Sequence, residues 1–337
     1  MTHGFTWRDG ERLIHFGRGA VSEAPQLLDQ NGFDDYVLLT TDRARRGVPD
    51  LAERAATLVE VPPGRVDEIS AALLLEIHGD MDRLVAVGGG RVVDTAKAIA
   101  GAMGGRCAAI PTTLSGAELT PFHRLPSGVE GAGMVRPAVV VADPDLMASA
   151  PLTRLAASAM NALAHAMEAL YTPLANPITD MAALRGAALL ADGITADPPD
   201  GEALALGALL AAYASGSTGI AVHHAVCQSI VRMTGAPHAE TNAVMLPHSA
   251  RLMAPRAPGP MSEFARALGD SAGDPEAAAG GASRIAARSG HTRLSTLGVT
   301  GEHLPGVAAT VAEHPLLANT PDPPGEEDLL GVLRGAL

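Results

Sequence analysis

Lysine is nearly absent from this sequence. Of 337 residues, 24 are lysine or arginine, and Lys97 is the only lysine among them. A chain that uses arginine wherever either residue would serve is expected to keep an ammonium group where a planar, forked guanidinium does not fit. We therefore expect Lys97 to occupy a site that requires an ammonium group.

Cysteine and aromatic residues are also scarce. The two cysteines, Cys107 and Cys227, are too few for a disulfide scaffold and lie in apolar surroundings, which is typical of a protein from the reducing cytoplasm. Aromatic residues make up 3% of the chain although 47% is hydrophobic, and the apolar residues are mainly alanine, leucine and valine. This composition favours closely packed helices and a parallel sheet over an all-β fold.

Excess positive charge and long apolar runs are missing too. The formal net charge of -13 argues against nucleic-acid binding, which needs a basic face. The N-terminal residues contain no apolar signal core, and no stretch is long and apolar enough to cross a bilayer without small or polar interruptions. We therefore expect a soluble cytoplasmic protein that binds neither nucleic acid nor membranes.

The first half of the chain alternates between strand-like and helix-like stretches. Near-continuous apolar runs predict strands that are buried on both faces, as in a parallel sheet. The alternation predicts a doubly wound α/β domain over residues 1–148. The expected strands are 12–16, 35–40, 57–61, 84–87, 108–111 and 138–142, and the expected helices are 20–31, 66–78 and 92–102.

The pattern changes in the second half. Strand signals disappear, and alanine- and leucine-rich helical stretches follow one another, separated by turns such as Asn176-Pro177. We expect an all-helical domain over residues 149–337. The small residues of 269–281 predict a mobile loop within it.

A glycine turn follows the strand expected over 84–87. Gly88, Gly89 and Gly90 separate this strand from a helix that carries Asp94 and Lys97. A strand, a glycine turn and a helix N-terminus together present free backbone N–H groups to a phosphate. The alternative is an ordinary tight turn followed by a solvated lysine, because short glycine motifs are weak evidence.

Polar residues follow two further strands of this half. Thr112 and Thr113 could donate hydrogen bonds to a phosphate or ribose, and Thr41-Asp42 ends the strand expected over 35–40. An acidic residue at such a position can bind a ribose 2′-hydroxyl and would repel a 2′-phosphate. Each could be ordinary turn chemistry, but together with the glycine turn they predict a dinucleotide site.

The helical half contains a cluster of histidines and an amide. Asn161 and His165 are four residues apart on one helix face, with Glu168 following, while His223-His224 and His238 lie in two other stretches. Neutral imidazoles from three elements and one oxygen ligand could bind a divalent transition metal. The alternative is that some of these histidines are core or capping residues.

Six ordered motifs resemble one known family. VGGGRVVDTAK, IPTTLSGAELTP, ADPDL, MNALAHAMEALY, VHHAVCQ and PHAETNAVMLPH follow one another as in the iron-containing alcohol dehydrogenase superfamily, and most closely as in its maleylacetate reductase branch. The resemblance covers essentially the whole chain. It implies the dehydroquinate synthase-like fold, in which an α/β dinucleotide-binding domain precedes an all-α domain, and it implies a homodimer.

The resemblance also implies roles for the N-terminal residues toward NAD(H). Gly88, Gly89 and Gly90 would approach the pyrophosphate, and Asp42 would meet the adenosine ribose, which favours NAD over NADP. Lys97 would lie near the ribose on the nicotinamide side, and Asp94 would orient the turn. The remaining residues implied to lie near the coenzyme are Thr112, Thr113 and Ser115.

The family's metal ligands are an aspartate and three histidines. The corresponding residues here are Asn161, His165, His224 and His238, with the fourteen-residue gap between the last two retained. Asn161 replaces the carboxylate and removes a negative charge from the site. The quartet is therefore either a weakened Fe2+ or Zn2+ site or a metal-free polar pocket that orients the substrate.

Two further positions depart from the family pattern. Gln228 replaces a histidine near the nicotinamide ribose and cannot relay a proton at neutral pH. Arg91 replaces the serine of the family's GGGS turn, where it could bind a further anion or crowd the pyrophosphate. These changes leave hydride transfer possible but weaken the expectation of alcohol oxidation.

The leading functional prediction is an NADH-dependent reductase of aromatic compound catabolism. It would deliver hydride to an electron-poor C=C or C=O bond of a small carboxylated substrate, as in the reduction of maleylacetate to 3-oxoadipate. His165, His224, His238 or a cation would stabilise the developing charge, and His223, His238 or water would supply a proton. The alternatives are a non-redox lyase, cyclase or dehydratase of specialised metabolism, and a ligand-binding protein without catalytic activity.

Overall fold

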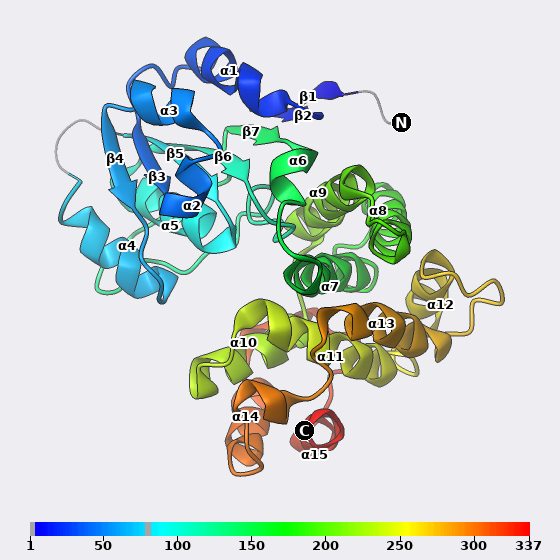
Figure 1. Cartoon of the computed structure of the whole chain (residues 1–337). Coiled ribbons are helices and arrows are strands. Elements are labelled where there is room, and N and C mark those ends of the chain that lie inside the picture. Colours follow the sequence, from blue (N-terminus) through cyan, green and yellow to red (C-terminus); the bar gives the residue numbers. More distant parts are fainter. Residues whose placement is uncertain (1–3, 78–81) are drawn as a thin grey trace. The chain divides into compact units, whose positions relative to one another are not determined.

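A parallel sheet forms the centre of the N-terminal half of this computed structural model, which describes residues 4–77 and 82–337 (Figure 1). The chain divides into two compact units, Met1–Ser149 and Ala150–Leu337. In the first unit seven described strands are ordered β1-β2-β7-β6-β5-β3-β4, and only the β1–β2 pair is antiparallel. The strands are β1 (Phe5–Asp9), β2 (Arg12–Phe16), β3 (Val37–Thr40), β4 (Thr57–Glu60), β5 (Arg83–Gly88), β6 (Arg106–Pro111) and β7 (Val139–Ala142).

Helices cover both faces of this sheet, which confirms the predicted doubly wound class. Along β5, Leu84 and Ala86 pack into one apolar cluster, while Val85 and Val87 pack into a second cluster on the opposite face. Alternate residues of a strand point to opposite faces, so a strand buried on both faces is apolar throughout. The helices of this unit are α1 (Ala24–Gln30), α2 (Asp42–Arg45), α3 (Pro49–Arg54), α4 (Val66–Leu74), α5 (Gly90–Met103) and α6 (Pro144–Met147), with a 3-10 turn η1 (Ala20–Glu23).

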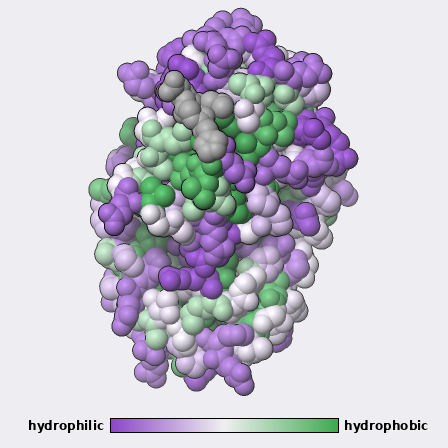
Figure 2. All heavy atoms as spheres, turned by 90° about the vertical axis from the view of Figure 1, so that its left-hand side faces the viewer, coloured by the Kyte–Doolittle hydropathy of each residue, from purple (hydrophilic) through white to green (hydrophobic). Residues whose placement is uncertain are grey.

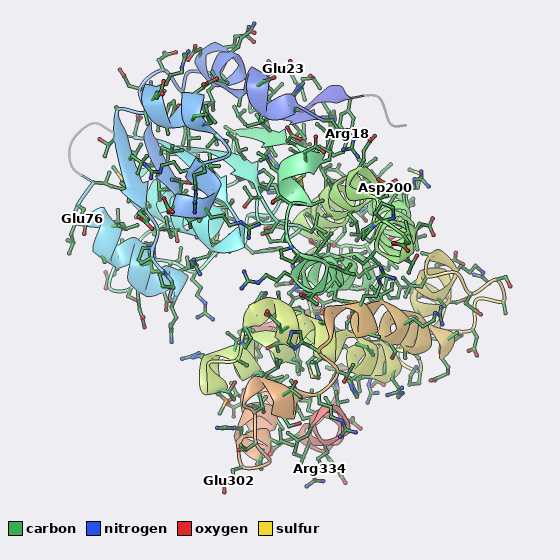
Figure 3. The ribbon with its side chains drawn as sticks, viewed as in Figure 1. Arg18, Glu23, Glu76, Asp200, Glu302 and Arg334 are labelled. Atoms are coloured by element: carbon green, nitrogen blue, oxygen red, sulfur yellow. The ribbon has the colours of Figure 1, made fainter. Side chains whose placement is uncertain are left out.

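The second unit is helical throughout its described residues, as predicted. Its longest helices pack closely because small residues meet at their contacts: a Cβ atom on Gly186 of α8 would lie 2.8 Å from the Gly207 carbonyl oxygen of α9. Asp200 caps α9 by accepting from the N–H groups of Glu202 and Ala203 (Figure 3). The helices are α7 (Leu152–Ala169), α8 (Pro177–Thr195), α9 (Gly201–Thr218), α10 (Val222–Thr234), α11 (His238–Met253), α12 (Pro258–Ala267), α13 (Ala277–Ala286), α14 (His303–Ala312) and α15 (Glu326–Ala336), with 3-10 turns η2 (Ala287–Ser289), η3 (Leu294–Leu297) and η4 (Pro315–Asn319).

Local predictions differ from the structure in several places, and the short helices α2, α3 and α6 were not predicted. β1 was not predicted, and its residues alternate between half-buried and exposed because it lies at the sheet edge. The helix expected over 20–31 is split into η1 and α1, and a proline occupies the first turn of α1, where its missing N–H is tolerated. α4 ends at Leu74, and the predicted end of that helix at residue 78 lies outside the described residues. The prediction of a loop over 269–281 is wrong for its last five residues, which belong to α13.

The small residues of α13 serve close packing. Ala278, Ala279 and Gly281 are buried, and a Cβ atom on Gly281 would lie 2.9 Å from Cβ of Leu268. A larger residue at position 281 would push this helix away from the chain that follows α12. The small residues that suggested a loop therefore allow a close contact of this helix with its neighbour.

The surface mixes polar and apolar side chains. Hydrophilic and hydrophobic residues are interspersed over the face shown in Figure 2. Among the described residues no single helix has both the length and the apolar composition to cross a membrane; one pair, α9 and α10, meets that criterion only when its two helices are joined across a bend of 99°.

Candidate active site

The glycine turn lies between β5 and α5, where the pattern predicted it. Gly88 ends the strand, Gly89 precedes the helix with φ -78 and ψ -177, and no side chain caps the helix N-terminus. A Cβ atom on Gly88 would lie 2.6 Å from Cγ2 of Val92, so only glycine allows the first turn of α5 to approach the strand this closely. The uncapped helix start offers backbone N–H groups to an anion.

Two hydroxyl side chains lie against this turn. A Cβ atom on Gly89 would lie 3.0 Å from Cγ2 of Thr113, and one on Gly90 would lie 3.0 Å from Oγ of Ser115. The Thr113 hydroxyl is buried and has no hydrogen-bond partner among the described residues. A buried hydroxyl without a partner is costly, so a ligand oxygen that pairs with it would remove that cost. This arrangement fits a phosphate of a dinucleotide.

Thr112 and Arg91 lie at the borders of the same turn. The Thr112 N–H donates to the Gly88 carbonyl oxygen over 2.9 Å, which ties the end of β6 to the turn. Arg91, the second residue of α5, is exposed. Whether Arg91 binds a further anion or crowds the pyrophosphate stays a prediction.

Asp42 lies at the carboxyl end of the neighbouring strand. β3 pairs in parallel with β5, with Thr40 opposite Val87, and the Thr40 hydroxyl donates to the Val87 carbonyl oxygen over 2.9 Å. Asp42 lies two residues after Thr40, and Gly89 lies two residues after Val87. The two residues therefore follow the ends of neighbouring strands at corresponding positions. The Asp42 carboxylate is not isolated, because it pairs with Arg45 at 3.1 Å and with Arg46 at 3.0 Å.

Lys97 lies in a buried cage of oxygen atoms. Its ammonium group donates to the carbonyl oxygens of Ala117, Thr120 and Phe122 at 2.8, 3.1 and 2.7 Å, and it lies 2.8 Å from Oδ1 of Asp94. Three carbonyl groups match the three protons of an ammonium group, which explains why arginine does not replace lysine here. The contact with a ribose stays a prediction, since every proton of the ammonium group already has an acceptor.

Sequence reasoning did not identify Glu118, which lies in the loop held by Lys97. Its side chain is fully buried, and neither carboxylate oxygen has a hydrogen-bond partner among the described residues. Burial raises the pKa of Glu118 from 4.5 to about 7, and the charge of Lys97 partly opposes that rise. No local pattern indicates burial at this position, because the burial results from the distant contacts of Lys97.

The structure brings the histidines of three helices into one neighbourhood. The rings of His165 (α7) and His224 (α10) stack with their centroids 4.5 Å apart, and the His223 ring meets the His224 ring edge-on at 5.3 Å. His238 begins α11 and is exposed. Burial, and secondarily the charge of His238, lowers the pKa of His224 to about 3. Burial and the neighbouring histidines lower the pKa of His165 well below its usual value.

Glu168 orients His224. Its Oε2 atom accepts from Nδ1 of His224 over 2.5 Å, and its Oε1 atom accepts from the backbone N–H groups of His223 and His224 over 2.7 and 3.3 Å. The carboxylate thus caps the start of α10, where a negative charge is favourable. It also holds the proton of His224 on Nδ1, which leaves Nε2 as an acceptor, and this Nε2 is buried without a partner among the described residues. The sequence placed Glu168 one turn after His165 but did not reveal this role.

His223 is fully buried and both of its ring nitrogens have partners. Nε2 lies 2.9 Å from Oδ1 of Asn242, and Nδ1 lies 2.9 Å from Oγ of Ser249. The Asn242 amide donates to the His238 carbonyl oxygen over 2.8 Å, so its oxygen faces His223 and Nε2 of His223 carries the proton. Burial lowers the pKa of His223 to about 4. The geometry therefore gives His223 a packing role, and proton donation by it stays a prediction.

The donor set that corresponds to the family's metal ligands contains three imidazoles and a neutral amide, and no carboxylate. No group of three or more His, Cys, Asp or Glu side chains in the described part of the chain could hold a metal ion. Asn161 lies buried one turn before His165, at the position where the family has a carboxylate, and Glu168 is committed to His224 and α10. Gln228 lies one turn after His224 and is half-buried.

Comparisons with known proteins cover both units. The model of the family "Iron-containing alcohol dehydrogenase" matches residues 15–151, and that of "Fe-containing alcohol dehydrogenase family, C-terminal" matches residues 155–337. A maleylacetate reductase of Sphingobium indicum is 37% identical over 281 residues, covering 78% of each chain, and maleylacetate reductase 1 of Rhodococcus opacus is 33% identical over 331 residues, covering 92% of this chain and 90% of that protein. The crystal structure of maleylacetate reductase from Agrobacterium tumefaciens superposes with a TM-score of 0.85 at 28% identity, covering 100% of this chain and 99% of that one.

Proposed function

Because the chain belongs to the iron-containing alcohol dehydrogenase family, we propose that it is an NAD(P)H-dependent reductase acting on an activated C=C or C=O bond of a small carboxylated substrate. Maleylacetate is the substrate we propose, because relatives over most of the chain are maleylacetate reductases. The product would be 3-oxoadipate.

The uncapped glycine turn is the observation that supports coenzyme binding most directly. The N–H groups at the start of α5 would bind the pyrophosphate, and the unpartnered Thr113 hydroxyl would pair with one of its oxygens. Asp42, at the end of the strand beside this turn, would bind the adenosine ribose. Ser115 lies against Gly90 and would complete the wall of the site.

The histidine cluster would bind the substrate and supply a proton. When bound, a reduced nicotinamide coenzyme would supply the hydride for one carbon of the double bond. The second carbon, activated through the adjacent carbonyl group, needs a proton to complete the reduction. His224 Nε2 is the group we assign to this transfer, with solvent as the source of the proton and Glu168 stabilising the imidazolium that forms transiently. His165, stacked on His224, offers a second ring for orienting the substrate oxygen.

A metal has no assigned role in this proposal. A neutral amide stands at position 161 in place of the family's carboxylate, and on that ground we propose that His165 and His224 act on the substrate as polar groups without a metal. Chelators should therefore leave the activity unchanged. A homodimer and a cytoplasmic location stay proposals that depend on the family resemblance and on composition.

Two alternatives are less well supported. A lyase, cyclase or dehydratase differs from the relatives, which are reductases. A ligand-binding protein without activity gives no reason for the buried, unpartnered Nε2 atom of His224. Neither alternative explains both sites.

Steady-state kinetics with purified protein test the proposal. The absorbance of NADH or NADPH should fall when maleylacetate is added, at a rate that a chelator does not change and that Gly89→Val abolishes. Gly89→Val places a branched side chain against Thr113 at the turn, whereas Gly331→Ala, in α15, has open space around the added methyl group and serves as the control. No coenzyme oxidation with either nucleotide, with or without added Fe2+ or Zn2+, would disprove the reductase assignment.

A further inference from the structure

A chain of hydrogen bonds leads from the core of the helical unit to His238 at its surface. Ser249 and His223 are buried, and the Ser249 hydroxyl donates to Nδ1 of His223 over 2.9 Å. Nε2 of His223 donates to Oδ1 of Asn242 over 2.9 Å. Nδ2 of Asn242 lies 2.8 Å from the His238 carbonyl oxygen and 3.3 Å from Nε2 of the His238 ring. One buried amide therefore connects the two histidines.

The direction of the last hydrogen bond determines which nitrogen of His238 carries the proton. An amide NH2 group can only donate, and the Asn242 amide is oriented with this group toward His238 because it donates to the His238 carbonyl oxygen. Nε2 of His238 is therefore an acceptor. In the neutral ring the proton then lies on Nδ1, which makes Nδ1 a donor.

The surroundings of Asn242 oppose a reversal of its amide. The side chain is fully buried. A reversed amide would direct its NH2 group at the Nε2–H group of His223 and its oxygen at the His238 carbonyl oxygen. Buried polar groups without partners are costly, so the orientation present in the structure is favoured. The protonation of an exposed ring is thus controlled from the core.

His238 belongs to the neighbourhood of the three buried histidines of the cluster. Burial lowers the pKa of each of those three, and the charge of His238 contributes to every one of these shifts. His238 itself is exposed, so a small ligand can reach it. It is also the first residue of α11, whose N-terminus has no side-chain cap and favours a nearby negative charge.

We propose that Asn242 is a positioning residue that holds His238 as an Nδ1–H donor, and that this donor binds a carboxylate group of the substrate. A hydrogen bond to a carboxylate is charge-assisted, so it is stronger than one between neutral groups. With the proton on Nε2 instead, the lone pair of Nδ1 would repel the same carboxylate. The inference rests on the proposed function, in which the substrate is a small carboxylated molecule.

The protonation of His238 in the substrate-free protein tests the positioning role. Long-range 1H–15N NMR spectra of protein labelled with [15N]histidine distinguish Nδ1–H from Nε2–H, and the signals lost in His238→Gln identify this ring. At mildly alkaline pH we expect Nδ1–H in the wild type. Asn242→Asp should place a proton on Nε2, because a carboxylate oxygen replaces the NH2 donor. Nε2–H in the wild type overturns the inference, whether or not the variant folds.

Asn31→Asp is the matched control for this substitution. The Asn31 amide also donates to the backbone carbonyl oxygen four positions earlier, that of Leu27, over 2.7 Å. Asn31 lies in the first unit, and none of its described contacts is with a histidine. This variant should keep the proton of His238 on Nδ1 and the wild-type KM for maleylacetate. A proton shift equal to that in Asn242→Asp would overturn the role of Asn242.

Two substitutions of His238 test the contact with the substrate. The amide of asparagine reaches the position of Nδ1 of a histidine ring, whereas the amide of glutamine reaches that of Nε2. We expect His238→Gln to raise the KM for maleylacetate about tenfold or more, because a donor to a charged group is lost. His238→Asn retains a donor near Nδ1, so its rise in KM should be at least about threefold smaller.

The outcomes separate this inference from the proposed function. Equal KM values for maleylacetate in the two His238 variants would overturn the carboxylate contact through Nδ1, while their reductase activity would leave the proposed function in place. Absence of coenzyme oxidation in the wild type would overturn the proposed function and the carboxylate contact together. The NMR measurement would still decide the role of Asn242, because it needs no substrate.

Discussion

Nδ1 of His224 donates to Oε2 of Glu168 over 2.5 Å, and both side chains are buried in the helical unit. The same carboxylate accepts from two backbone N–H groups at the start of α10. Glu168 therefore has two roles: it stabilises the start of α10, and it determines which ring nitrogen of His224 carries the proton.

Glu168→Gln tests the chemical part of this relationship. The amide retains an oxygen for the N–H groups of α10, but its NH2 group would face Nδ1 of His224 and would move the ring proton to Nε2. By analogy with the loss of tautomer control in catalytic triads, we expect kcat to fall by about 10²- to 10⁴-fold. KM and the thermal midpoint should change little. A kcat within threefold of the wild type would contradict the assigned role of Glu168, and Glu240→Gln, on a different helix, is the control for the substitution itself.

Lys97→Met should destabilise the α/β unit. The substitution leaves three carbonyl groups and the nearby Asp94 without their cation, and removal of one partner from a buried charged group costs about 3 kcal/mol. Backbone amides of the loop over 117–122 should exchange faster by hydrogen–deuterium exchange. Lys97→Arg should also be destabilising, since a guanidinium overfills a site that is fully buried. Unchanged exchange in both variants would show that Lys97 does not anchor the loop.

Glu118→Gln tests the effect of burial on stability as a function of pH. The folded protein keeps the Glu118 proton up to about pH 7, whereas the unfolded chain loses it near pH 4.5. Unfolding therefore releases a proton between these values, and this group makes the protein less stable as pH rises through that range. The variant has no such proton, so its stability relative to wild type should increase by about 3 kcal/mol between pH 4.5 and pH 8.

Chemical denaturation at several pH values measures this difference. Glu76→Gln, at an exposed residue beyond α4, should show no comparable trend and serves as the control (Figure 3). A difference between Glu118→Gln and wild type that does not vary with pH would mean that burial does not raise the pKa of Glu118 above its value in the unfolded chain.

Asn161→Asp tests the missing carboxylate of the metal quartet. The substitution places a negative oxygen ligand one turn before His165 and beside a buried imidazole pair, a donor set that suits Zn2+ or Fe2+. We expect saturating Zn2+ to raise the thermal midpoint of the variant by several degrees through preferential binding to the folded state. The wild type and Asn161→Ala should not respond. A wild-type response equal to that of the variant would contradict the metal-free proposal.

The sequence predicted the local elements of the coenzyme site well. An apolar run followed by three glycines and an amphipathic stretch typically forms a strand, a tight turn and a helix. β5, the glycine turn and α5 have this structure. His165 and His224 were also correctly singled out, and their rings stack. Local patterns were sufficient for the turn, whereas His165 and His224, 59 positions apart, were brought together only by the family resemblance.

Long-range contacts were the features that the sequence could not reveal. The three carbonyl groups around Lys97 come from residues 20 to 25 positions away, and the partner of His224 is 56 positions away. Nothing in the local sequence pattern indicates partners at such separations along the chain. The pairing of Asp42 with Arg45 and Arg46 is different, because the i,i+3 and i,i+4 spacing was visible in the sequence and could have been interpreted.

Transfer of deuterium from [4-2H]NADH to maleylacetate tests the central claim most directly. If the chain is a reductase of an activated double bond, mass spectrometry should find one carbon-bound deuterium in the 3-oxoadipate formed with the reactive isomer of the coenzyme, and none with the other isomer. Formation of a product without deuterium from either isomer, or coenzyme oxidation without 3-oxoadipate, would contradict the account.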